Sequence, residues 1–359
     1  MLDLSIPRPI LKIIKRLKQK GYTTYLVGGC VRDLLLGLEP KDYDIGTTAT
    51  PREVVSLFPK RAFIIGRRFP IVHVYITKDQ YVEVSTFRGK EEYDGKVKEN
   101  YGTPEEDVLR RDLTINALFY DVFSKEIIDY VGGLEDLKKG IIRVIGDPDQ
   151  RFLNDPVRML RAIRHASRLK FYIEPSTWEA IIRNAHLIKK VVWERLRDEI
   201  LKDLMGFWVL DWFRLLQKSG LLYQIYPFYL KMVEEKSLDE NFLRLVLTKL
   251  SQDQGLTVEE RICLFAYVFL PLIGKPYVPL SFQPVPVFER KELLRLFFSL
   301  FFTFRFNRRL FERSMDLLRD VYKGLYFAQK KQPIPKKIRK KTYFHQILKL
   351  VSILQDILN

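Results

Sequence analysis

The feature that most constrains the fold is a change in hydrophobic pattern near residue 146. Before this point, short apolar runs with a period of two alternate with short helical segments. After the turn Gly146-Asp147-Pro148, helical periodicity continues with few breaks. The 359 residues are enough for more than one hydrophobic core. We therefore expect a mixed α+β N-terminal part followed by an all-α C-terminal part.

Glycine and proline divide the N-terminal part into short elements. Gly21 ends a helical pattern, Gly28-Gly29 turns a strand into a helix, and Thr50-Pro51 has the residue types of a helix start. The expected elements are a helix over 10–20, a strand over 25–27, a helix over 30–36, a strand over 41–45, a helix ending at Leu57, and a hairpin of strands 71–76 and 81–87.

The C-terminal part is expected to contain helices over 157–169, 176–184 and 194–204, then further helices interrupted by a proline-rich linker or loop over 271–286. We expect four domains. They are a mixed α+β domain over 1–145, helical domains over 146–206 and 207–270, and a linker with a basic helical tail over 271–359.

Charge is distributed unevenly along the chain. The formal net charge of +17 divides into +1 for residues 1–150 and +16 for residues 151–359. This asymmetry favours a polyanionic partner for the C-terminal part, although a solvated lysine-rich surface would give the same count. Residues 330–359 carry eight bases against one acid, with Tyr343 and Phe344 nearby. Phosphate contacts with such a partner are expected from Lys336, Lys337, Arg339, Lys340 and Lys341, the alternative being a frayed, merely soluble terminus.

Other composition features exclude some classes of protein. The most apolar run, 296–304, falls well short of the roughly 20 apolar residues that cross a bilayer, so we expect no membrane partner. Cys30 and Cys263 cannot form a disulfide framework. Together with the absence of an N-terminal basic-then-apolar segment, this predicts a cytoplasmic protein. The pattern leaves the oligomeric state open.

Three carboxylates are candidate metal ligands. Asp42 and Asp44 lie two residues apart on the expected strand 41–45, so both would point from one face. Glu83 lies between Val82 and Val84 in the hairpin and could join them if its strand pairs beside theirs. Three such carboxylates can hold two Mg²⁺ ions for phosphoryl chemistry. Alternatively, Asp42 is a turn residue and Glu83 faces solvent.

The Gly28-Gly29 junction is a candidate phosphate site. It lies between a strand and a helix, where backbone N–H groups can bind an anion, and Arg32 follows in the first helical turn. The alternatives are a simple tight turn and a surface pair of Arg32 with Asp33. Taken together with the acids, these residues predict a site for a magnesium-bound nucleoside triphosphate.

Five motifs occur in the order found in a known family. They are LVGGCVRDLLLG at 26–37 followed by KDYD at 41–44, RRDLTINA at 110–117, GGLEDL at 132–137, DPVRMLRA at 155–162 and ERL at 194–196. Residues 22–205 therefore resemble the class II tRNA nucleotidyltransferases and bacterial poly(A) polymerases of the polymerase-β-like superfamily. The resemblance implies a catalytic palm with a mixed sheet, then a neck that reads the nucleotide and helical body and tail domains that hold RNA.

The resemblance also implies roles for individual residues. Asp42, Asp44 and Glu83 would bind metal, and Gly28, Gly29 and Arg32 would contact the triphosphate. Arg111, Asp112 and Asn116 would position the sugar and phosphates of the nucleotide. The physical alternatives are that Arg110 and Arg111 pair with the acids at 105–107, and that Asn116 caps a helix.

Base selection is expected from Asp155 and Arg158, which are three residues apart at the start of a helix. The Asp155 carboxylate can accept from the exocyclic amino group and Arg158 can donate to the ring nitrogen, a pair of atoms that adenine and cytosine share. Guanine and uracil present the reverse pattern of donor and acceptor at those atoms. The alternative is that Asp155 caps the helix and pairs with Arg158 in the first turns. Asn154 stands where the family usually has Glu, which removes a charge that would orient Arg158. Further expected nucleotide contacts are Arg161, Arg164 and Arg195.

The expected reaction is attack of an RNA 3′-hydroxyl on ATP with release of pyrophosphate. The stretch IIGRRFPIVHV at 64–74 resembles a marker of bacterial poly(A) polymerases, as does YGTPEED at 101–107. The alternative is addition of CCA, or only CC or A, to tRNA, in which case CTP is also a substrate. Residues 90–100 resemble the loop that switches between CTP and ATP, or form a solvated hairpin tip. A more distant alternative is an RNA-binding protein without catalysis.

Overall fold

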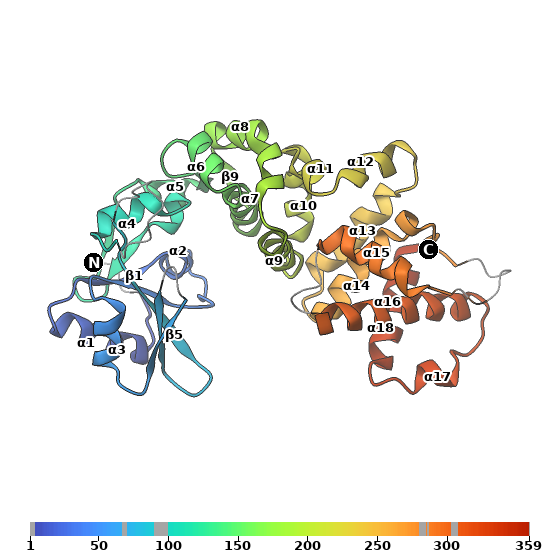
Figure 1. The fold of residues 1–359 in the computed structure, drawn as a ribbon, viewed down its shortest axis with the longest axis horizontal. Helices are drawn as coiled ribbons and strands as arrows, with labels where there is room; N and C mark the ends of the chain where they lie inside the picture. The colour runs from blue at the N-terminus through green and yellow to red at the C-terminus, as the bar shows by residue number, and fades with distance from the viewer. Residues whose placement is uncertain are drawn as a thin grey trace. The chain divides into compact units, whose positions relative to one another are not determined.

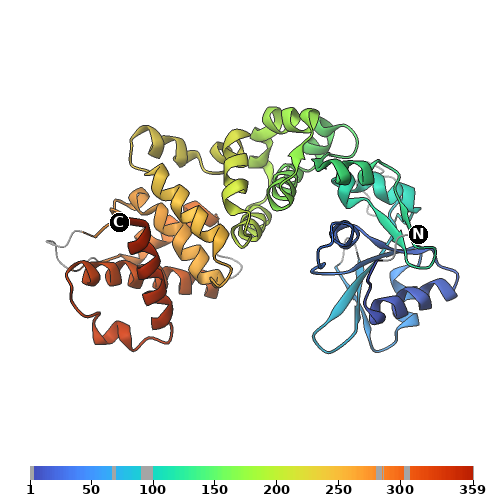
Figure 2. The same ribbon diagram turned by 180° about the vertical axis from the view of Figure 1, so that it is seen from behind.

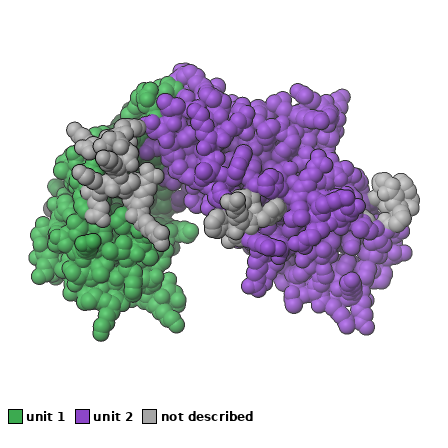
Figure 3. All heavy atoms as spheres, in the orientation of Figure 1, with its two compact units in different colours: residues 1–151, 171–177 green, residues 152–170, 178–359 purple. Residues whose placement is uncertain are grey.

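The computed structural model describes residues 4–66, 70–89, 100–279, 285, 287–302 and 308–358. The chain divides into two compact units (Figure 3). Unit 1 comprises residues 1–151 and 171–177, and unit 2 comprises residues 152–170 and 178–359. Each unit is described by itself.

Unit 1 is built on a mixed seven-stranded sheet with the order β3-β4-β5-β2-β1-β6-β7 (Figure 1). The strand β2 pairs parallel with β5, and the other neighbouring strands pair antiparallel. The strands are β1 Thr24–Val27, β2 Asp44–Thr47, β3 Ala62–Ile65, β4 Ile71–Tyr75, β5 Tyr81–Thr86, β6 Phe119–Asp121 and β7 Glu126–Ile128. The expected α+β head and its hairpin are confirmed.

Short helices connect and cover these strands. They are α1 Arg8–Gln19, α2 Gly29–Leu35, α3 Pro51–Leu57, α4 Pro104–Arg110, the 3₁₀ turn η1 Thr114–Asn116, α5 Gly133–Lys139 and α6 Pro148–Asn154. Their starts follow local sequence rules. At α3, the Thr50 N–H donates to Glu53 Oε2 at 2.7 Å while the Glu53 N–H donates to Thr50 Oγ1, which is the capping box that Thr50-Pro51 predicts.

Helices cover one face of the sheet and leave the other open beside β3, β4 and β5. The helix α1 packs on β1 and on α3, and α3 packs on β3, β4 and β5 (Figures 1 and 2). The residues Val72, Val74, Val82 and Val84 are buried, whereas the residues that alternate with them are partly or fully exposed. Since side chains alternate between faces, the second face of these strands is open to solvent.

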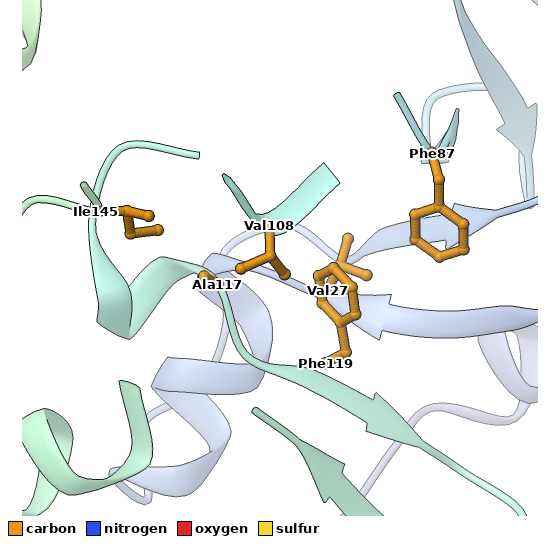
Figure 4. Close-up of a cluster of buried hydrophobic side chains, with 6 residues drawn as sticks. All are labelled: Val27, Phe87, Val108, Ala117, Phe119 and Ile145. Carbon is orange, nitrogen blue, oxygen red and sulfur yellow. The ribbon is translucent and has the colours of Figure 1, made fainter. Parts of the chain in front are cut away.

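A buried cluster holds the centre of unit 1 together (Figure 4). It joins β1, the end of β5, α4 and β6 through Val27, Phe87, Val108, Ala117, Phe119 and Ile145. Close packing against β2 requires Gly46, because a Cβ there would lie 2.5 Å from the Phe87 ring and 2.9 Å from Val27 Cγ1. The cluster therefore fixes β2 beside β1 and the end of β5.

A second contact brings a later segment of the chain back to unit 1. Residues 171–177 include β9 Tyr172–Ile173, which pairs parallel with β8 Ile141–Ile142. The Val144 N–H donates to Thr177 Oγ1 at 3.3 Å, and Arg143 lies 3.5 Å from the Glu174 carboxylate.

Unit 2 is helical throughout the residues that the structure describes. Its centre is α14, whose residues 260–268 are all buried and contact α13, α16 and α18. The elements are α7 Val157–Leu169, α8 Pro175–Asn184, η2 Ala185–Lys190, α9 Trp193–Leu204, α10 Val209–Lys218, α11 Leu221–Ile225, α12 Pro227–Glu234, α13 Glu240–Gln252, α14 Val258–Val268, η3 Leu270–Ile273, α15 Arg290–Phe301, α16 Arg308–Gln329, α17 Lys336–Arg339 and α18 Phe344–Leu358. The further division into neck, body and tail stays a prediction.

Some expected elements differ from those observed. The predicted strand 41–45 begins only at Asp44, because pairing with β5 starts there and pairing with β1 starts at Ile45, and Asp42 lies in a bend. Residues 271–273 of the expected linker belong to the 3₁₀ turn η3 Leu270–Ile273, while 280–284 and 286 lie outside the described residues. The strands β3, β6 and β7 and the helix α6 were not predicted, because three to seven residues show little periodicity.

A buried ion cluster in unit 2 corrects one expected site residue. Arg164 on α7 donates from Nε to Asp203 Oδ1 at 2.6 Å, from Nη2 to Asp203 Oδ2 at 2.9 Å and from Nη1 to the Glu199 carboxylate. All three residues are buried. Arg164 therefore links α7 to α9, and this structural role replaces the expected nucleotide contact.

Replacing Arg164 should destabilise unit 2. In Arg164→Met, two buried carboxylates lose their cation, and we expect the free energy of unfolding to fall by about 3–5 kcal/mol. Denaturant unfolding followed by tryptophan fluorescence measures this, because all four tryptophans lie in unit 2. Lys202→Met is the matched control, since Lys202 binds the same Glu199 at 3.0 Å but is 60% exposed. If both variants lost the same free energy of unfolding, the buried ion cluster would not be what stabilises unit 2.

Candidate active site

Parallel pairing of β2 with β5 brings two expected metal ligands together. Asp44 and Glu83 are register partners on these neighbouring strands, so their side chains leave the same face of the sheet. Glu83 is partly exposed, and its Oε1 lies 3.4 Å from His73 Nε2 on β4. Glu83 lies on the solvent-open face of β5, as the alternative expected, and it is beside Asp44 on that face.

The surroundings of the Asp44 carboxyl disfavour its ionised form. Burial raises the pKa of its carboxyl to about 6, with further increases from the Glu83 and Asp42 carboxylates and an opposing effect from Arg111. Asp42 itself is exposed in the bend before β2, as the turn alternative expected. Within the described part of the chain, no three His, Cys, Asp or Glu side chains form a closed metal cluster. The structure thus brings Asp44 and Glu83 together with Asp42 at the edge, an oxygen set of the kind that Mg²⁺ prefers.

Gly28 allows a close approach between β1 and the RRDLTINA segment. Its φ of 75° lies in the left-handed region, and a Cβ there would lie 3.0 Å from Arg111 Nη1. The Gly28 N–H donates to the Leu118 carbonyl at 3.1 Å, so it is occupied within the fold. This corrects the expectation that the Gly28 N–H binds phosphate. The glycine instead lets the Arg111 guanidinium lie close to the backbone at Gly28.

Four expected nucleotide-binding residues form one hydrogen-bond network. Arg32 is buried and donates to Asp33 Oδ1 at 2.7–2.8 Å and to Asn116 Oδ1. Asn116 Nδ2 donates to Asp112 Oδ1 at 3.2 Å, and Arg111 Nη1 donates to the Asn116 carbonyl at 3.2 Å. Because Arg32 and Asp33 are both buried, the interpretation of them as a surface pair is wrong.

Asp107, expected only as one of several acids near Arg111, orients this network. It binds Arg111 through Oδ2, 3.0 Å from Nε and 2.9 Å from Nη2, and its Oδ1 accepts from the Arg88 N–H at 3.1 Å. The spacing of four residues on a helix was the available signal. Arg151, which was not predicted, supports the same segment by donating from Nη2 to the carbonyls of Arg110 and Arg111.

A second group of expected residues lies in unit 2. Asp155 Oδ2 accepts from Arg195 Nη2 at 2.8 Å and lies 3.9 Å from Arg158 Nε. Asp155 Oδ1 also accepts from the Val157 N–H at 3.3 Å, as in the helix-cap alternative. Asp155, Arg158 and Arg195 are thus brought together, with Arg195 half exposed. Arg161 is half-buried on the same helix, and Asn154 is exposed at the end of α6.

The expected RNA-binding tail is partly structural. Lys336, Lys337, Arg339 and Lys340 are exposed around the buried Ile338 of α17. Lys341 instead forms an ion pair with Asp320 of α16 and donates to the Tyr343 hydroxyl at 3.0 Å. Lys341 therefore anchors the end of α17. The four exposed bases remain candidates for contacts with RNA.

Two segments that are expected to set nucleotide specificity lie partly outside the described residues. The Gly-Arg-Arg-Phe stretch includes residues 67–69, and the expected switching loop includes residues 90–99, and both ranges lie outside the described residues. The ends of the second segment are described. The Gly89 N–H donates to the Asn100 carbonyl at 2.9 Å, and the Gly102 N–H donates to the Phe87 carbonyl at 2.8 Å.

Family models match both units of the chain. Residues 24–143 match a model described as the poly A polymerase head domain. Residues 170–232 match a model described as the probable RNA and SrmB-binding site of polymerase A.

The curated relatives of the chain include poly(A) polymerases I and CCA-adding enzymes. Poly(A) polymerase I of Haemophilus influenzae is 38% identical over 257 residues, which is 68% of this chain and 56% of that protein. Poly(A) polymerase I of Escherichia coli O6:H1 is 42% identical over 62% of this chain and 50% of its own. A CCA-adding enzyme of Ligilactobacillus salivarius is 42% identical over 55% of this chain and 49% of its own. The chain thus spans about half the length of these relatives.

Solved structures share the fold over nearly the whole chain. The Bacillus stearothermophilus CCA-adding enzyme in complex with CTP has a TM-score of 0.71 at 28% identity, covering 99% of this chain and 79% of its own. A tRNA nucleotidyltransferase with a primer tRNA and an ATP analog has a TM-score of 0.63 at 24% identity, covering 96% and 94%. With the motifs and the site geometry, these matches show that the chain belongs to the family of class II tRNA nucleotidyltransferases and bacterial poly(A) polymerases.

Proposed function

We propose that this protein is a template-independent RNA 3′-terminal nucleotidyltransferase that uses ATP. The observation that carries the proposal is the register of Asp44 with Glu83, which places two carboxylates beside the Arg111 and Asn116 network. The RNA 3′-hydroxyl attacks the α-phosphorus of ATP, the bond from that phosphorus to the bridging oxygen breaks, and pyrophosphate leaves. A non-catalytic RNA-binding protein would have no need of this arrangement.

Asp44 and Glu83, with Asp42 at the edge, would hold the two Mg²⁺ ions. Bound there, the ions would lower the pKa of the attacking hydroxyl and offset charge on the leaving group. The chain's own part is to hold the two carboxylates side by side, and bound cations would favour their ionised form. The raised pKa of Asp44 supports this assignment, because an unneutralised carboxylate cluster is unfavourable without a cation.

Arg111 is the cation proposed to face the triphosphate. Asp107 and the Asn116 carbonyl hold its guanidinium in place before substrate arrives, and its electrostatic effect on Asp44 puts it near the carboxylates. Arg32, with Asn116 and Asp112, supports the same segment from within.

Asp155 and Arg158 are proposed to select the base. The Asp155 carboxylate would accept from the exocyclic amino group, and Arg158 would donate to the neighbouring ring nitrogen. Arg195, bound to Asp155 at 2.8 Å, keeps the carboxylate oriented. Arg195 therefore orients Asp155, whereas Asn154 supplies no negative charge to orient Arg158 as the family's Glu would.

The proposed substrates are ATP and the 3′ end of RNA, with poly(A) synthesis as the first choice. Its support is the longer match to poly(A) polymerase I, over 68% of the chain, and the Gly-Arg-Arg-Phe stretch in the sequence. The second candidate is addition of CCA to tRNA with CTP and ATP, favoured by the likeness to a CCA-adding enzyme in complex with CTP. The exposed Lys336, Lys337, Arg339 and Lys340 are proposed to contact RNA phosphates.

A cytoplasmic location is part of the proposal. Both Cys30 and Cys263 are buried and free, as a reducing compartment would leave them. None of the helices in the described ranges has the length and apolar character to cross a membrane.

Removing a proposed metal ligand should abolish incorporation without unfolding the protein. We expect Asp44→Asn to lower the rate of AMP incorporation into an RNA primer by roughly a hundredfold or more. Because the substitution relieves repulsion with Glu83, the variant should unfold at the same or a higher denaturant concentration. Asp79→Asn, in the exposed hairpin turn, is the control. Normal activity in Asp44→Asn would refute the site.

The two candidate reactions differ in where extension stops. Purified protein is incubated with tRNA lacking CCA, tRNA ending in CCA, and oligo(A), each with ATP, CTP or both. We expect ATP to extend oligo(A) and completed tRNA by many residues. Extension that needs both nucleotides and halts at CCA would select the second candidate instead.

The Asp155 and Arg158 pair should control nucleotide choice. We expect Asp155→Asn and Arg158→Lys each to reduce the preference for ATP over GTP by roughly tenfold or more, because each removes one partner in base recognition. The ratio of kcat/KM for the two nucleotides measures this. Asp211→Asn and Arg214→Lys form the matched control, since this exposed pair in unit 2 has the same spacing and lies 3.4 Å apart. An unchanged ratio in the first two variants would defeat the assignment.

A further inference from the structure

An aromatic cluster lies on the open face of β3, β4 and β5. It consists of Phe63, His73, Tyr75 and Tyr81, and is called the aromatic face below. His73 stacks on Tyr81 with ring centroids 3.9 Å apart and an interplanar angle of 10°. Tyr75 lies 5.6 Å from Tyr81 and 5.7 Å from Phe63. The four rings therefore form one continuous surface.

This surface is not part of the hydrophobic core. Phe63 is 52% exposed and Tyr81 is 45% exposed, although the same strands bury their valines on the opposite face. Large apolar side chains gathered in an exposed patch usually mark a binding surface. The fold alone does not account for aromatic residues at these positions.

Cations border the aromatic face. A hollow of about 430 Å³ is lined by Phe63, Tyr75, Lys60, Arg61, Lys78 and their neighbours Ile76 and Thr77, and no carboxylate belongs to this described lining. Arg61 donates from Nε and Nη2 to the carbonyls of Tyr75 and Ile76, each at 3.0 Å, which fixes its charge beside the rings. Aromatic rings next to fixed cations suit the bases and phosphates of a single-stranded nucleic acid.

The aromatic face continues directly into the candidate active site. The register places Phe63, His73, Glu83 and Asp44 in one row across β3, β4, β5 and β2. The network of Arg111 and Asn116 lies at the β1 side of the same carboxylates. In an in-line displacement, the attacking and leaving groups approach phosphorus from opposite sides. If the triphosphate lies at the β1 side, the acceptor hydroxyl arrives from the side of β4 and β3.

We propose that the aromatic face binds the last nucleotides of the RNA acceptor strand. Bases stack on Phe63, Tyr75 and Tyr81, while Lys60, Arg61 and Lys78 contact the phosphates. The inference rests on the proposed function, since it takes Glu83 as the end of the path where the 3′-hydroxyl reacts. Because every base has a π face, this mode of binding is independent of acceptor sequence.

A kinetic experiment tests the proposal on the whole protein. The double variant Phe63→Leu with Tyr75→Leu keeps apolar volume but removes two rings. We expect the KM for an oligo(A) acceptor to rise about tenfold, which corresponds to about 1.4 kcal/mol. The KM for ATP should change less than twofold. The control is Tyr172→Leu, an 83% exposed tyrosine of unit 1 outside the seven-stranded sheet. Equal acceptor KM values in the double variant and the wild type would overturn the proposal.

A second experiment needs no catalysis, so it separates failure of this proposal from failure of the proposed function. Oligo(A) with 5-iodouridine at the second or third nucleotide from its 3′ end is bound to the wild-type protein and photo-crosslinked. We expect crosslinks to Phe63, Tyr75 or Tyr81 that the double variant loses. Crosslinks only to unit 2 would overturn the proposal even if incorporation is normal. A dimer that the double variant converts to monomer, with an unchanged crosslink pattern, would identify a protein interface and also overturn it.

Discussion

Parallel pairing of β2 with β5 is the constraint on which the site depends. It forces Asp44 and Glu83 into neighbouring positions, where burial and mutual repulsion raise the pKa of Asp44 to about 6. Such a pair would separate unless packing held it. That packing comes from the cluster around Phe87 and Val27, and Gly46 is the residue that lets both approach β2. Core packing thus maintains an arrangement that electrostatics disfavours, which is a common property of catalytic sites.

The sequence predicted elements whose pattern was long or sharply bounded. The helix 157–169 was predicted with both ends correct, because thirteen residues give a clear period and Pro156 precedes them. The hairpin of β4 and β5 followed from its alternation around 77–80. The pairing of Asp44 with Glu83 could only be a hypothesis, since strand order depends on contacts between distant segments. Buried hydrogen bonds, such as that of Gly28 with Leu118, were equally inaccessible.

The distribution of charge also depends on contacts between segments that are distant in the sequence. The net charge of +16 for residues 151–359 indicated a polyanionic partner, but a net count does not show which of the bases are exposed and which are buried in ion pairs. Arg164 binds Glu199 and Asp203, and Lys341 binds Asp320. Helical spacing put Arg161 and Arg164 in one series, yet the acids that bury Arg164 come from α9, far along the chain. The bases that remain exposed, such as those of α17, are a smaller set than the composition suggests.

The return of residues 171–177 to unit 1 has a consequence for how the protein can be divided. The backbone passes between the units at residues 151, 170 and 177, so three covalent crossings join them. A fragment ending at residue 151 would lack β9 and the Thr177 hydroxyl that binds the Val144 N–H. Unit 1 is therefore discontinuous in sequence, and a gene fragment cut at the apparent boundary would encode an incomplete domain. No single recombination breakpoint between relatives would keep both units intact, because a breakpoint before residue 177 divides unit 1 and a later one separates residues 152–170 from the rest of unit 2.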